Sequence, residues 1–499
     1  MNTLRKFAVW LDDRLHLTAL YASTAGHEVP ASAGSWFYVF GSATLLCFVL
    51  QIITGACLAF VYIPSTNEAF TSLEYLNHAQ FLGWYLRAIH FWCSNFMVSL
   101  MTLHMIQVFL FGAYKYPREL TWVTGVFLLI TTLGMAFTGQ VMRFDQDAYW
   151  GLGIGASVMG RVPLIGAQLV HAMLAGPIIA GETLSRFSTL HVFILPGLII
   201  AFVSVHLRLV LTKGINEYPK PGHPVHKATY DAEYADILRK DGVPFVPNAI
   251  GKDLIFAAVV VAGILVCALI FGPKGPTGIP NPTLVNTNPR PDFYFLSIFA
   301  VAALVPDWME VVVLFVAPVL AIAGLLALPF ISGTGEKSAL RRPVAVLSVI
   351  FVMLVIGVLA YMGETSPWSP DMAAWSGNAI PVQFVRGRTP LEIHGALVFQ
   401  NKQCRNCHAL GGQGGQRGPA LDTVATRLTK DQMVRQVIQG GGNMPAYGKK
   451  LSPAEVEALT SFLVTLTPKS SPPVRNSAPP QNKLPRDLAV IGPPVRLSK

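Results

Sequence analysis

Seven long apolar stretches dominate the first 365 residues of the chain. They cover residues 36–63, 80–113, 121–141, 187–211, 254–272, 311–332 and 343–362. A helix that crosses a lipid bilayer needs about 20 predominantly apolar residues, and each stretch supplies roughly that length. The pattern therefore predicts an all-α, polytopic membrane protein with seven transmembrane helices.

Beyond residue 365 the pattern becomes that of a soluble chain. Helical periodicity appears at Leu391–Gln400, Thr429–Gln439 and Pro453–Leu466, whereas the residues after Pro468 are rich in Pro, Ser, Asn and Lys. A segment of that last composition buries too little apolar surface to fold alone. We therefore predict a small α-helical domain at residues 385–467, followed by an extended tail at 468–499.

Composition and charge agree with a membrane protein. Apolar residues make up 52% of the chain and charged residues only 13%, against about 25% charged in soluble domains. This excludes a disordered chain, a coiled coil and an ordinary cytosolic enzyme. We attribute the net charge of +10 to Lys and Arg residues in the loops, which set the orientation of transmembrane helices. No nucleic-acid partner is therefore expected.

Loop charges also predict the orientation of the helices. With a cytoplasmic N-terminus, fifteen Lys and Arg residues fall in cytoplasmic segments and five in the opposite loops. The positive-inside rule favours this arrangement. Seven crossings then place the soluble domain on the outer side of the membrane.

Paired histidines mark the second and fourth predicted helices. His90 and His104 are 14 residues apart, and His191 and His206 are 15 apart. Both intervals return close to the starting face of a helix, about 21 to 22 Å along its axis. Two such helices side by side present two levels of facing imidazoles, as two six-coordinate haem irons require. Four hydrogen-bonded core histidines are the alternative, whereas one shared metal ion is excluded by the distance between levels.

Glycines recur at the same interval on the first and third predicted helices. Gly41 and Gly55 are 14 residues apart, as are Gly125 and Gly139. Glycine leaves room for a flat macrocycle between helices, although small residues also serve ordinary helix–helix contacts. The shared interval favours the first interpretation.

Two arginines, Arg87 and Arg186, fall near the outer level of histidines. There they would neutralise the propionates of a haem. Ordinary anchoring at the membrane interface is the alternative interpretation.

Several segments of the first 365 residues resemble the cytochrome b subunit of cytochrome bc complexes. They are Lys115–Gly125, Phe137-Thr-Gly139 followed by Asp145-Gln146, and Arg186–His191, together with the histidine pairs. The 15-residue interval and the seven spans are similar to the plastid-type cytochrome bf branch, where a four-helix haem subunit and a three-helix subunit share these helices. The resemblance implies a di-haem domain at residues 1–215 and a three-helix domain with a quinol-site loop at 216–365.

The resemblance also implies which histidines form each pair. The outer haem b would be held by His90 and His191, and the inner haem b by His104 and His206.

Two positions depart from the family pattern. A cysteine that anchors an additional inner haem in the plastid-type complex is replaced here by Val39, so a covalent third haem in the membrane part is not expected. The Pro-Trp that precedes Asp-Gln in the family is here Arg143-Phe144, which alters one wall of the outer quinone pocket.

The sequence Pro291-Asp292-Phe293-Tyr294 follows a loop rich in Pro and Gly. An aspartate in a partly apolar pocket can have a raised pKa and accept a proton from a quinol; a turn with a capping aspartate is the alternative. The motif resembles the family's quinol-oxidation signature Pro-Glu-Trp-Tyr. This implies catalytic roles for Asp292 and Tyr294, and the Asp form is typical of low-potential quinones, so menaquinone is the expected substrate.

The soluble domain contains Cys404-Arg-Asn-Cys407-His408, the signature of covalent c-type haem attachment. The two thiols bind the haem and His408 supplies one axial ligand. Met444 is the candidate second ligand and resembles that of class I cytochromes c, although methionine also packs ordinary cores. A redox dithiol or half of a zinc site is the alternative, but a dithiol does not need His408 and the zinc site lacks further cysteines.

Together these features predict a quinol:cytochrome c oxidoreductase that works by a Q-cycle. The chain has no motif for an iron–sulfur cluster, so a Rieske partner is expected, with another c-type cytochrome as electron acceptor. The family implies a homodimeric complex. The alternatives are a non-bifurcating or reverse-running quinone complex and, in a different class, a transporter with a tethered haem sensor.

Overall fold

The computed structural model describes residues 3–175, 179, 181–280, 288–370, 380–402, 404–413, 418–441, 444, 446–448 and 451–468. Two compact units emerge. One contains Met1–Asp145, Phe187–Gly278 and Arg290–Ser366, and the other contains Gln146–Arg186, Ile279–Pro289 and Pro367–Lys499. The predicted tail lies outside the described residues from 469 onward.

The first unit is built from helices. They are α1 (Thr3–Leu15), α2 (Leu17–Ser23), α3 (Val39–Ala59), α4 (Ala69–His78), α5 (Gly83–Leu110), α6 (Glu119–Met142), α10 (Leu195–Lys213), α11 (Tyr230–Asp241), α12 (Phe245–Asn248), α13 (Ile250–Phe271), α14 (Leu296–Leu304), α15 (Ala317–Ile331) and α16 (Pro343–Thr365). Helix α9 (Gly181–Thr189) crosses the boundary between the units. Among the described residues, the strands are β1 (Glu28–Pro30) and β2 (Gly242–Pro244), which pair antiparallel.

Short helical turns connect these elements. Single 3₁₀ turns lie at Ala31–Gly34, Trp36–Tyr38, Phe293–Phe295, Asp307–Met309 and Ala339–Arg341. Two π-helical turns, η3 (Leu190–Ile194) and η6 (Val312–Val316), continue directly into α10 and α15.

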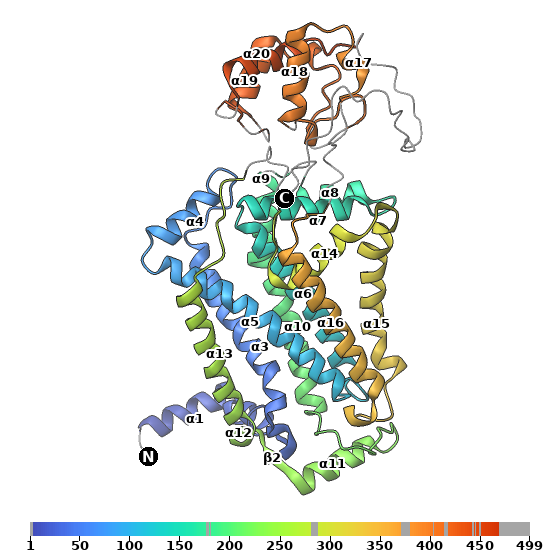
Figure 1. The fold of residues 1–499 in the computed structure, drawn as a ribbon. Helices are drawn as coiled ribbons and strands as arrows, with labels where there is room; N and C mark the ends of the chain where they lie inside the picture. The colour runs from blue at the N-terminus through green and yellow to red at the C-terminus, as the bar shows by residue number, and fades with distance from the viewer. Residues whose placement is uncertain are drawn as a thin grey trace. The chain divides into compact units, whose positions relative to one another are not determined.

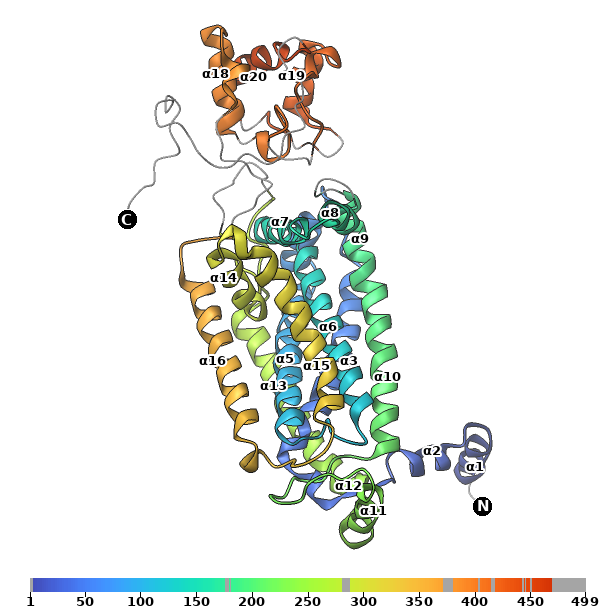
Figure 2. The same ribbon diagram turned by 90° about the vertical axis from the view of Figure 1, so that its right-hand side faces the viewer.

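Seven helices of the described chain are long and apolar enough to cross a membrane (Figures 1 and 2). They are Trp36–Ala59, Gly83–Leu110, Glu119–Met142, Gly181–Lys213, Ile250–Phe271, Val312–Ile331 and Pro343–Thr365. The predicted all-α, seven-span membrane fold is therefore confirmed.

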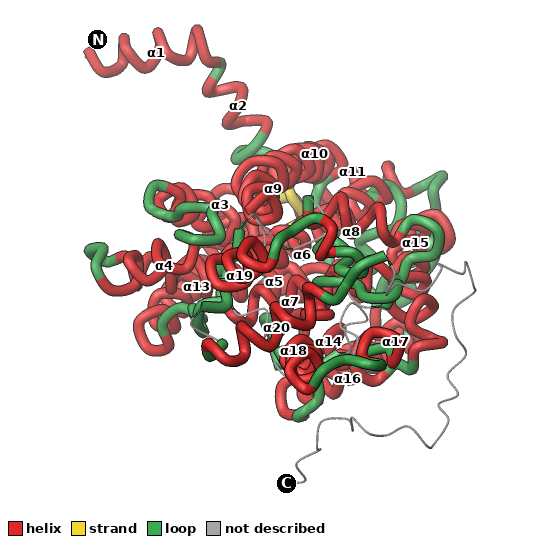
Figure 3. The backbone as a smooth tube through the Cα atoms, turned by 90° about the horizontal axis from the view of Figure 1, so that it is seen from above, coloured by secondary structure: helices red, strands yellow, loops and turns green. Residues whose placement is uncertain are grey.

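The helices that carry the paired histidines and glycines pack in pairs. Helix α3 packs on α5, and α6 packs on α10 (Figure 3 shows them end on). Helix α13 covers α3 and α5, and α15 covers α6. An apolar cluster that includes Cys47, Cys93, Ile199 and Ile264 joins α3, α5, α10 and α13. These contacts fix the rotation of each helix about its own axis, and so determine which side chains face the middle of the bundle.

Polar side chains tie together the loops at the end of the bundle where α10 ends. Lys337 is 3% exposed and its Nζ lies 2.5 Å from Glu217 Oε1. Nearby, Arg118 donates to the Gly214 carbonyl at 3.0 Å and to the Tyr230 hydroxyl at 2.6 Å. Burial lowers the pKa of Lys337 to about 8, against the opposing effect of Glu217. The ion pair therefore keeps a buried ammonium charged.

The second unit contains α7 (Gln146–Gly160), α8 (Gly166–Leu174), α17 (Val382–Val385), α18 (Pro390–Asn401), α19 (Lys430–Gln439) and α20 (Pro453–Val464), with 3₁₀ turns at Cys404–Asn406 and Val424–Thr426. Capping boxes begin α18, α19 and α20, and in each a Ser or Thr side chain accepts from the backbone three residues later. The three helices predicted for the soluble domain are confirmed.

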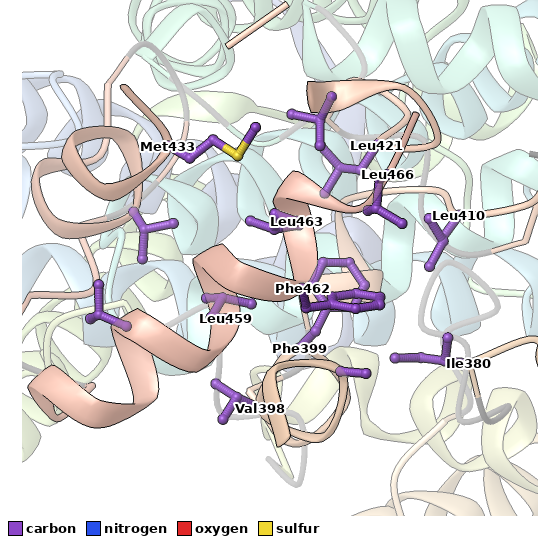
Figure 4. Close-up of a cluster of buried hydrophobic side chains, with 14 of the residues drawn as sticks. Ile380, Val398, Phe399, Leu410, Leu421, Met433, Leu459, Phe462, Leu463 and Leu466 are labelled. Atoms are coloured by element: carbon purple, nitrogen blue, oxygen red, sulfur yellow. The ribbon is translucent and has the colours of Figure 1, made fainter. Parts of the chain in front are cut away.

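The core of these last helices is compact. Phe399 of α18 and Phe462 of α20 face each other with ring centroids 5.9 Å apart (Figure 4). Leu410, Leu466 and Met433 are also buried in this cluster. The core holds α18, α19 and α20 in fixed positions around the Cys404–His408 segment.

The ion pair at the loop end of the bundle leads to a stability prediction. Glu217→Gln leaves the ammonium of Lys337 buried without its counter-charge, which should cost roughly 3 kcal/mol. The thermal unfolding midpoint of the detergent-purified protein should fall. Asp236→Asn is the matched control, because Asp236 pairs with Lys240 on an exposed part of α11 and surface pairs contribute only about 0.5 kcal/mol. Equal midpoints for the two variants would contradict this account.

Candidate functional site

The four histidines lie inside the helix bundle, on α5 and on the η3–α10 helix. The rings of His90 and His191 face each other, with centroids 6.5 Å apart and planes inclined by 74°. His104 and His206 interact electrostatically as the second pair. Imidazole–metal bonds are about 2.0–2.1 Å long, so two such bonds and the two half-rings account for the 6.5 Å separation. The structure thus brings together the pairs that the sequence predicts.

The unequal spacing of the histidines has a structural cause. His191 lies within the π-helical turn Leu190–Ile194, which inserts one extra residue into the helix. The 15-residue interval to His206 therefore has the angular phase of a 14-residue interval in a regular α-helix. The π turn therefore keeps both imidazoles on nearly the same face of the helix.

Each predicted glycine lies against one histidine. A Cβ atom built on Gly55 would be 3.1 Å from His90 Cε1, and one on Gly139 would be 2.7 Å from His191 Cε1. At the other level the corresponding distances are 3.1 Å from Gly41 to His104 and 3.7 Å from Gly125 to His206. Side chains at these positions would compete with the imidazoles for space. The glycines therefore keep a slot open on both sides of each pair.

Threonine hydroxyls orient three of the imidazoles. The Oγ1 atoms of Thr54, Thr138 and Thr124 lie 2.8, 3.0 and 2.9 Å from the Nδ1 atoms of their neighbouring histidines, His90, His191 and His206. Each hydroxyl donates its own proton to a carbonyl of its own helix. The hydroxyl can then only accept from Nδ1–H, which leaves Nε2 with a free lone pair. That is the tautomer a metal ligand needs.

His104 differs from the other three. The residue before its glycine is Phe40 instead of threonine, and its Nδ1 is buried without a hydrogen-bond partner in the described part of the chain. The ring of His104 packs against Gly41.

The two arginines predicted for the outer level have different surroundings. Arg87 is buried and donates to Asn77 Oδ1 at 2.9 Å, to the Gly275 carbonyl at 2.8 Å and to the Lys274 carbonyl at 2.5 Å. Arg186 is exposed and donates to the Ala172 carbonyl at 2.7 Å. Their assignment to haem propionates stays a prediction.

The Pro-Asp-Phe-Tyr segment forms a small polar cluster. Asp292 is 8% exposed; its Oδ1 accepts from Lys274 Nζ at 3.1 Å and its Oδ2 from the Tyr294 hydroxyl at 3.1 Å. The Asp292 backbone amide donates to Gln140 Oε1 at 3.4 Å. Burial, reinforced by the Asp292 charge, raises the pKa of Tyr294 well above its usual range. Tyr294 therefore remains a hydrogen-bond donor, and Lys274 holds the carboxylate in place.

Between the C-terminal helices α18 and α19, His408 is held by a backbone hydrogen bond. Its Nδ1 lies 2.8 Å from the Pro419 carbonyl, to which it donates, so Nε2 is free. Burial, with a smaller effect of Arg427, lowers the pKa of His408 despite that hydrogen bond and favours the neutral ring. A Cβ on Gly418 would be only 2.5 Å from His408 Cε1, so glycine is needed here for the ring to fit.

The other predicted residues of this site adjoin the same core. The side chains of Cys404 and Cys407 are partly exposed, and the His408 amide donates to the Cys404 carbonyl at 3.0 Å. Met444 packs against the core, and its sulfur accepts from Gln436 Nε2 at 3.7 Å. Asn443 and Pro445 lie outside the described residues, and the role of Met444 as an iron ligand stays a prediction.

Comparison with known proteins identifies both parts of the chain. The family model for cytochrome b/b6/petB matches residues 26–214. Cytochrome b6 of Prochlorothrix hollandica is 39% identical over 207 residues, which is 42% of this chain and 93% of that protein. Cytochrome b6 of Heliobacterium modesticaldum is 40% identical over 209 residues, 42% of this chain and 98% of that protein. The chain belongs to the cytochrome b/b6 family.

Two further comparisons extend beyond this region. A solved structure described as hyperthermophilic respiratory Complex III covers 72% of this cytochrome b and 91% of its own chain, with a TM-score of 0.61 and 27% identity. Residues 393–463 match the family model for cytochrome C oxidase, cbb3-type, subunit III. The predicted fusion of a b6-like cytochrome b with a C-terminal cytochrome c domain is confirmed, and the two parts imply haem b and haem c.

Sequence reasoning missed several residues of the site. The threonines were detectable in principle, because Thr54, Thr124 and Thr138 each directly precede a predicted glycine. Lys274 and Gln140 carry no such signal, since both reach Asp292 from segments distant in sequence.

The threonine contacts predict a selective loss of haem. Thr138→Val keeps the side-chain volume but removes the acceptor for His191 Nδ1–H, which should weaken haem retention at that level about tenfold or more. Pyridine haemochrome analysis of the purified protein measures this. Thr131→Val on the same helix is the control, because the Thr131 hydroxyl bonds only its own helix. Identical b-haem content in both variants would refute this role.

Proposed function

We propose that this cytochrome b is the redox core of a membrane complex that oxidises quinol and delivers electrons to a c-type cytochrome. The observation that carries the proposal is the arrangement of four imidazoles in two pairs, of which His90 and His191 face each other, with a glycine against every imidazole. A pair of neutral imidazoles with free Nε2 atoms suits a bis-histidine iron porphyrin.

The residues that would hold the haems follow from this geometry. His90 and His191 would ligate the outer haem b, and His104 and His206 the inner one. When bound, these groups supply single-electron carriers across the bilayer. The protein fixes the tautomers of His90, His191 and His206 through threonine hydroxyls. It also excludes side chains from the slots and separates the two levels along α5.

The third haem would be held by the soluble domain. Cys404 and Cys407 would form the covalent bonds, His408 the first axial bond and Met444 the second. The hydrogen bond from His408 to the Pro419 carbonyl fixes the ring for this purpose.

Asp292 is the proton acceptor of the proposed quinol site. Oxidation of a quinol to a quinone releases two electrons and two protons, so the site needs a base beside the substrate hydroxyl. The Asp292 carboxylate accepts a proton at Oδ2 once the Tyr294 hydroxyl turns to the substrate oxygen. Lys274 keeps Oδ1 in place during this exchange.

The complex requires other components. We propose a Rieske iron–sulfur protein that takes the first electron and passes it to the fused c-haem, and a further c-type cytochrome as acceptor. The second electron would cross the membrane to the cytoplasmic side. Two turnovers would supply the two electrons that, with two protons, reduce one quinone there and complete a Q-cycle. Menaquinone is the proposed quinone and a homodimer the proposed assembly, in a bacterial inner membrane with the cytochrome c domain in the periplasm.

Haem counting tests the proposed cofactor arrangement. The purified complex should contain two b-haems per c-haem, and His104→Ala should remove the inner b-haem while the outer one stays detectable in the reduced spectrum. A b-haem content in this variant equal to that of wild type would contradict the ligand assignment. A wild-type protein without b-haem would leave only the transporter with a haem sensor.

The proton-acceptor role is tested by a pair of substitutions. Asp292→Asn should lower kcat for oxidation of a menaquinol analogue by about 10²-fold, the usual contribution of a general base, whereas Asp292→Glu keeps a carboxylate and should retain most activity. Both b-haems should remain in both variants. Equal activity of the Asn and Glu variants would rule out proton transfer to Asp292, and turnover of ubiquinol analogues alone would rule out menaquinone.

A further inference from the structure

Arg143 is a buried arginine whose donors have no acceptor. The residue is 9% exposed, and its Nε, Nη1 and Nη2 atoms are all buried without a hydrogen-bond partner in the described part of the chain. Its one ionic neighbour there is Asp145, whose Oδ2 lies 3.6 Å from Nε. That oxygen also accepts from the Thr277 amide at 3.1 Å.

Burying an arginine without hydrogen-bond acceptors is energetically unfavourable. A guanidinium carries five N–H donors, and buried charges are normally both paired and hydrogen-bonded. One carboxylate beyond hydrogen-bond distance satisfies neither condition fully. The surroundings of Arg143 therefore point to an anionic oxygen ligand.

The position of Arg143 indicates which ligand that is. Arg143 follows Gly139 by four residues and caps the C-terminal end of α6. It therefore lies about one helical turn beyond Gly139, on nearly the same face. Gly139 faces His191. Arg87 likewise precedes His90 by three residues on α5. Both arginines thus lie one turn beyond the outer histidine level, at the same end of the bundle.

Several charged side chains lie near Arg143 at this end of the bundle. Arg87 and Arg143 lie close enough to repel each other electrostatically, and Asp145 interacts with both. Lys274 is paired with Asp292.

The two arginines are not equivalent. Arg87 already donates to Asn77 and to the carbonyls of Lys274 and Gly275, whereas Arg143 donates to no described residue. Arg87 therefore stabilises the loop at residues 274–275. The donors of Arg143 remain available for a ligand.

We propose that Arg143 binds a propionate carboxylate of the haem held between His90 and His191, a role that the sequence pattern suggested for Arg87 and Arg186. This inference rests on the proposed haem site. A planar guanidinium suits a carboxylate because it offers two parallel N–H donors. Arg143 is a positioning residue that also sets the haem's redox potential, because a nearby cation favours the reduced form with its additional electron.

Redox titration of both b-haems in the purified complex tests the proposal. Arg143→Met should lower the outer potential, so that the equilibrium constant for outer-to-inner electron transfer rises about tenfold, which is 59 mV for one electron. The outer potential should also become pH-dependent and fall as pH rises, because the propionate now titrates. The inner haem serves as an internal control with an unchanged potential.

Two further variants keep the test interpretable. Arg143→Lys retains the charge but lacks the planar guanidinium, so it should shift the outer redox potential by an intermediate amount. Loss of the outer haem in Arg143→Met, with its retention in Arg143→Lys, would also support the proposal. Arg342→Met removes a hydrogen-bonded arginine from the opposite end of the bundle and should leave the outer potential unchanged.

Three outcomes would overturn the inference. The first is an unchanged outer potential in both Arg143 variants, and the second is a lowered potential without pH dependence. The third is an increased KM for quinol as the sole effect, which would mean that Arg143 binds the substrate and not the haem. Failure of the haem site itself is distinguishable, because a wild-type complex would then lack the outer b-haem.

Discussion

The pairing of imidazoles across the bundle is the constraint on which the rest of this structure depends. Two helices must each present two histidines to the same interior slots, and any rotation of either helix would misplace both. The packing of α3 on α5 and of α6 on α10 sets these rotations. The π turn at Leu190–Ile194 corrects the phase of the 15-residue interval. Each glycine then leaves space beside one histidine ring, and the threonines fix the tautomers of three of the four rings.

The two ends of the bundle handle their buried charges differently. At the end near Lys337, the cationic side chains of Lys337 and Arg118 bind Glu217, Tyr230 and backbone carbonyls, and these contacts hold the loops together. At the end near Asp292, the carboxylate is held by Lys274 but Arg143 retains unused donors. Buried polar groups without partners are typical of sites that bind a ligand. The unused donors of Arg143 support the proposed ligand at the second end.

Much of this could be predicted from the sequence because its signals are periodic or contiguous. Hydropathy gives the seven spans, helix geometry gives the phase of His90 and His104, and the Cys404–His408 signature is contiguous. The remaining features depend on tertiary contacts. The approach of Lys274 to Asp292 and the isolation of Arg143 arise only when separate segments pack together. Arg87 illustrates the limit, because its loop contacts were invisible in the pattern that marked it as a haem partner.

The central claim is that the paired imidazoles bind two porphyrin irons inside the membrane domain. An electron cryo-microscopy map of the intact complex tests it most directly. The account predicts two flat densities one above the other, each bridged on both sides by histidine rings, with glycine backbone at their edges. Histidine rings that contact only protein side chains, with no density between them, would contradict it.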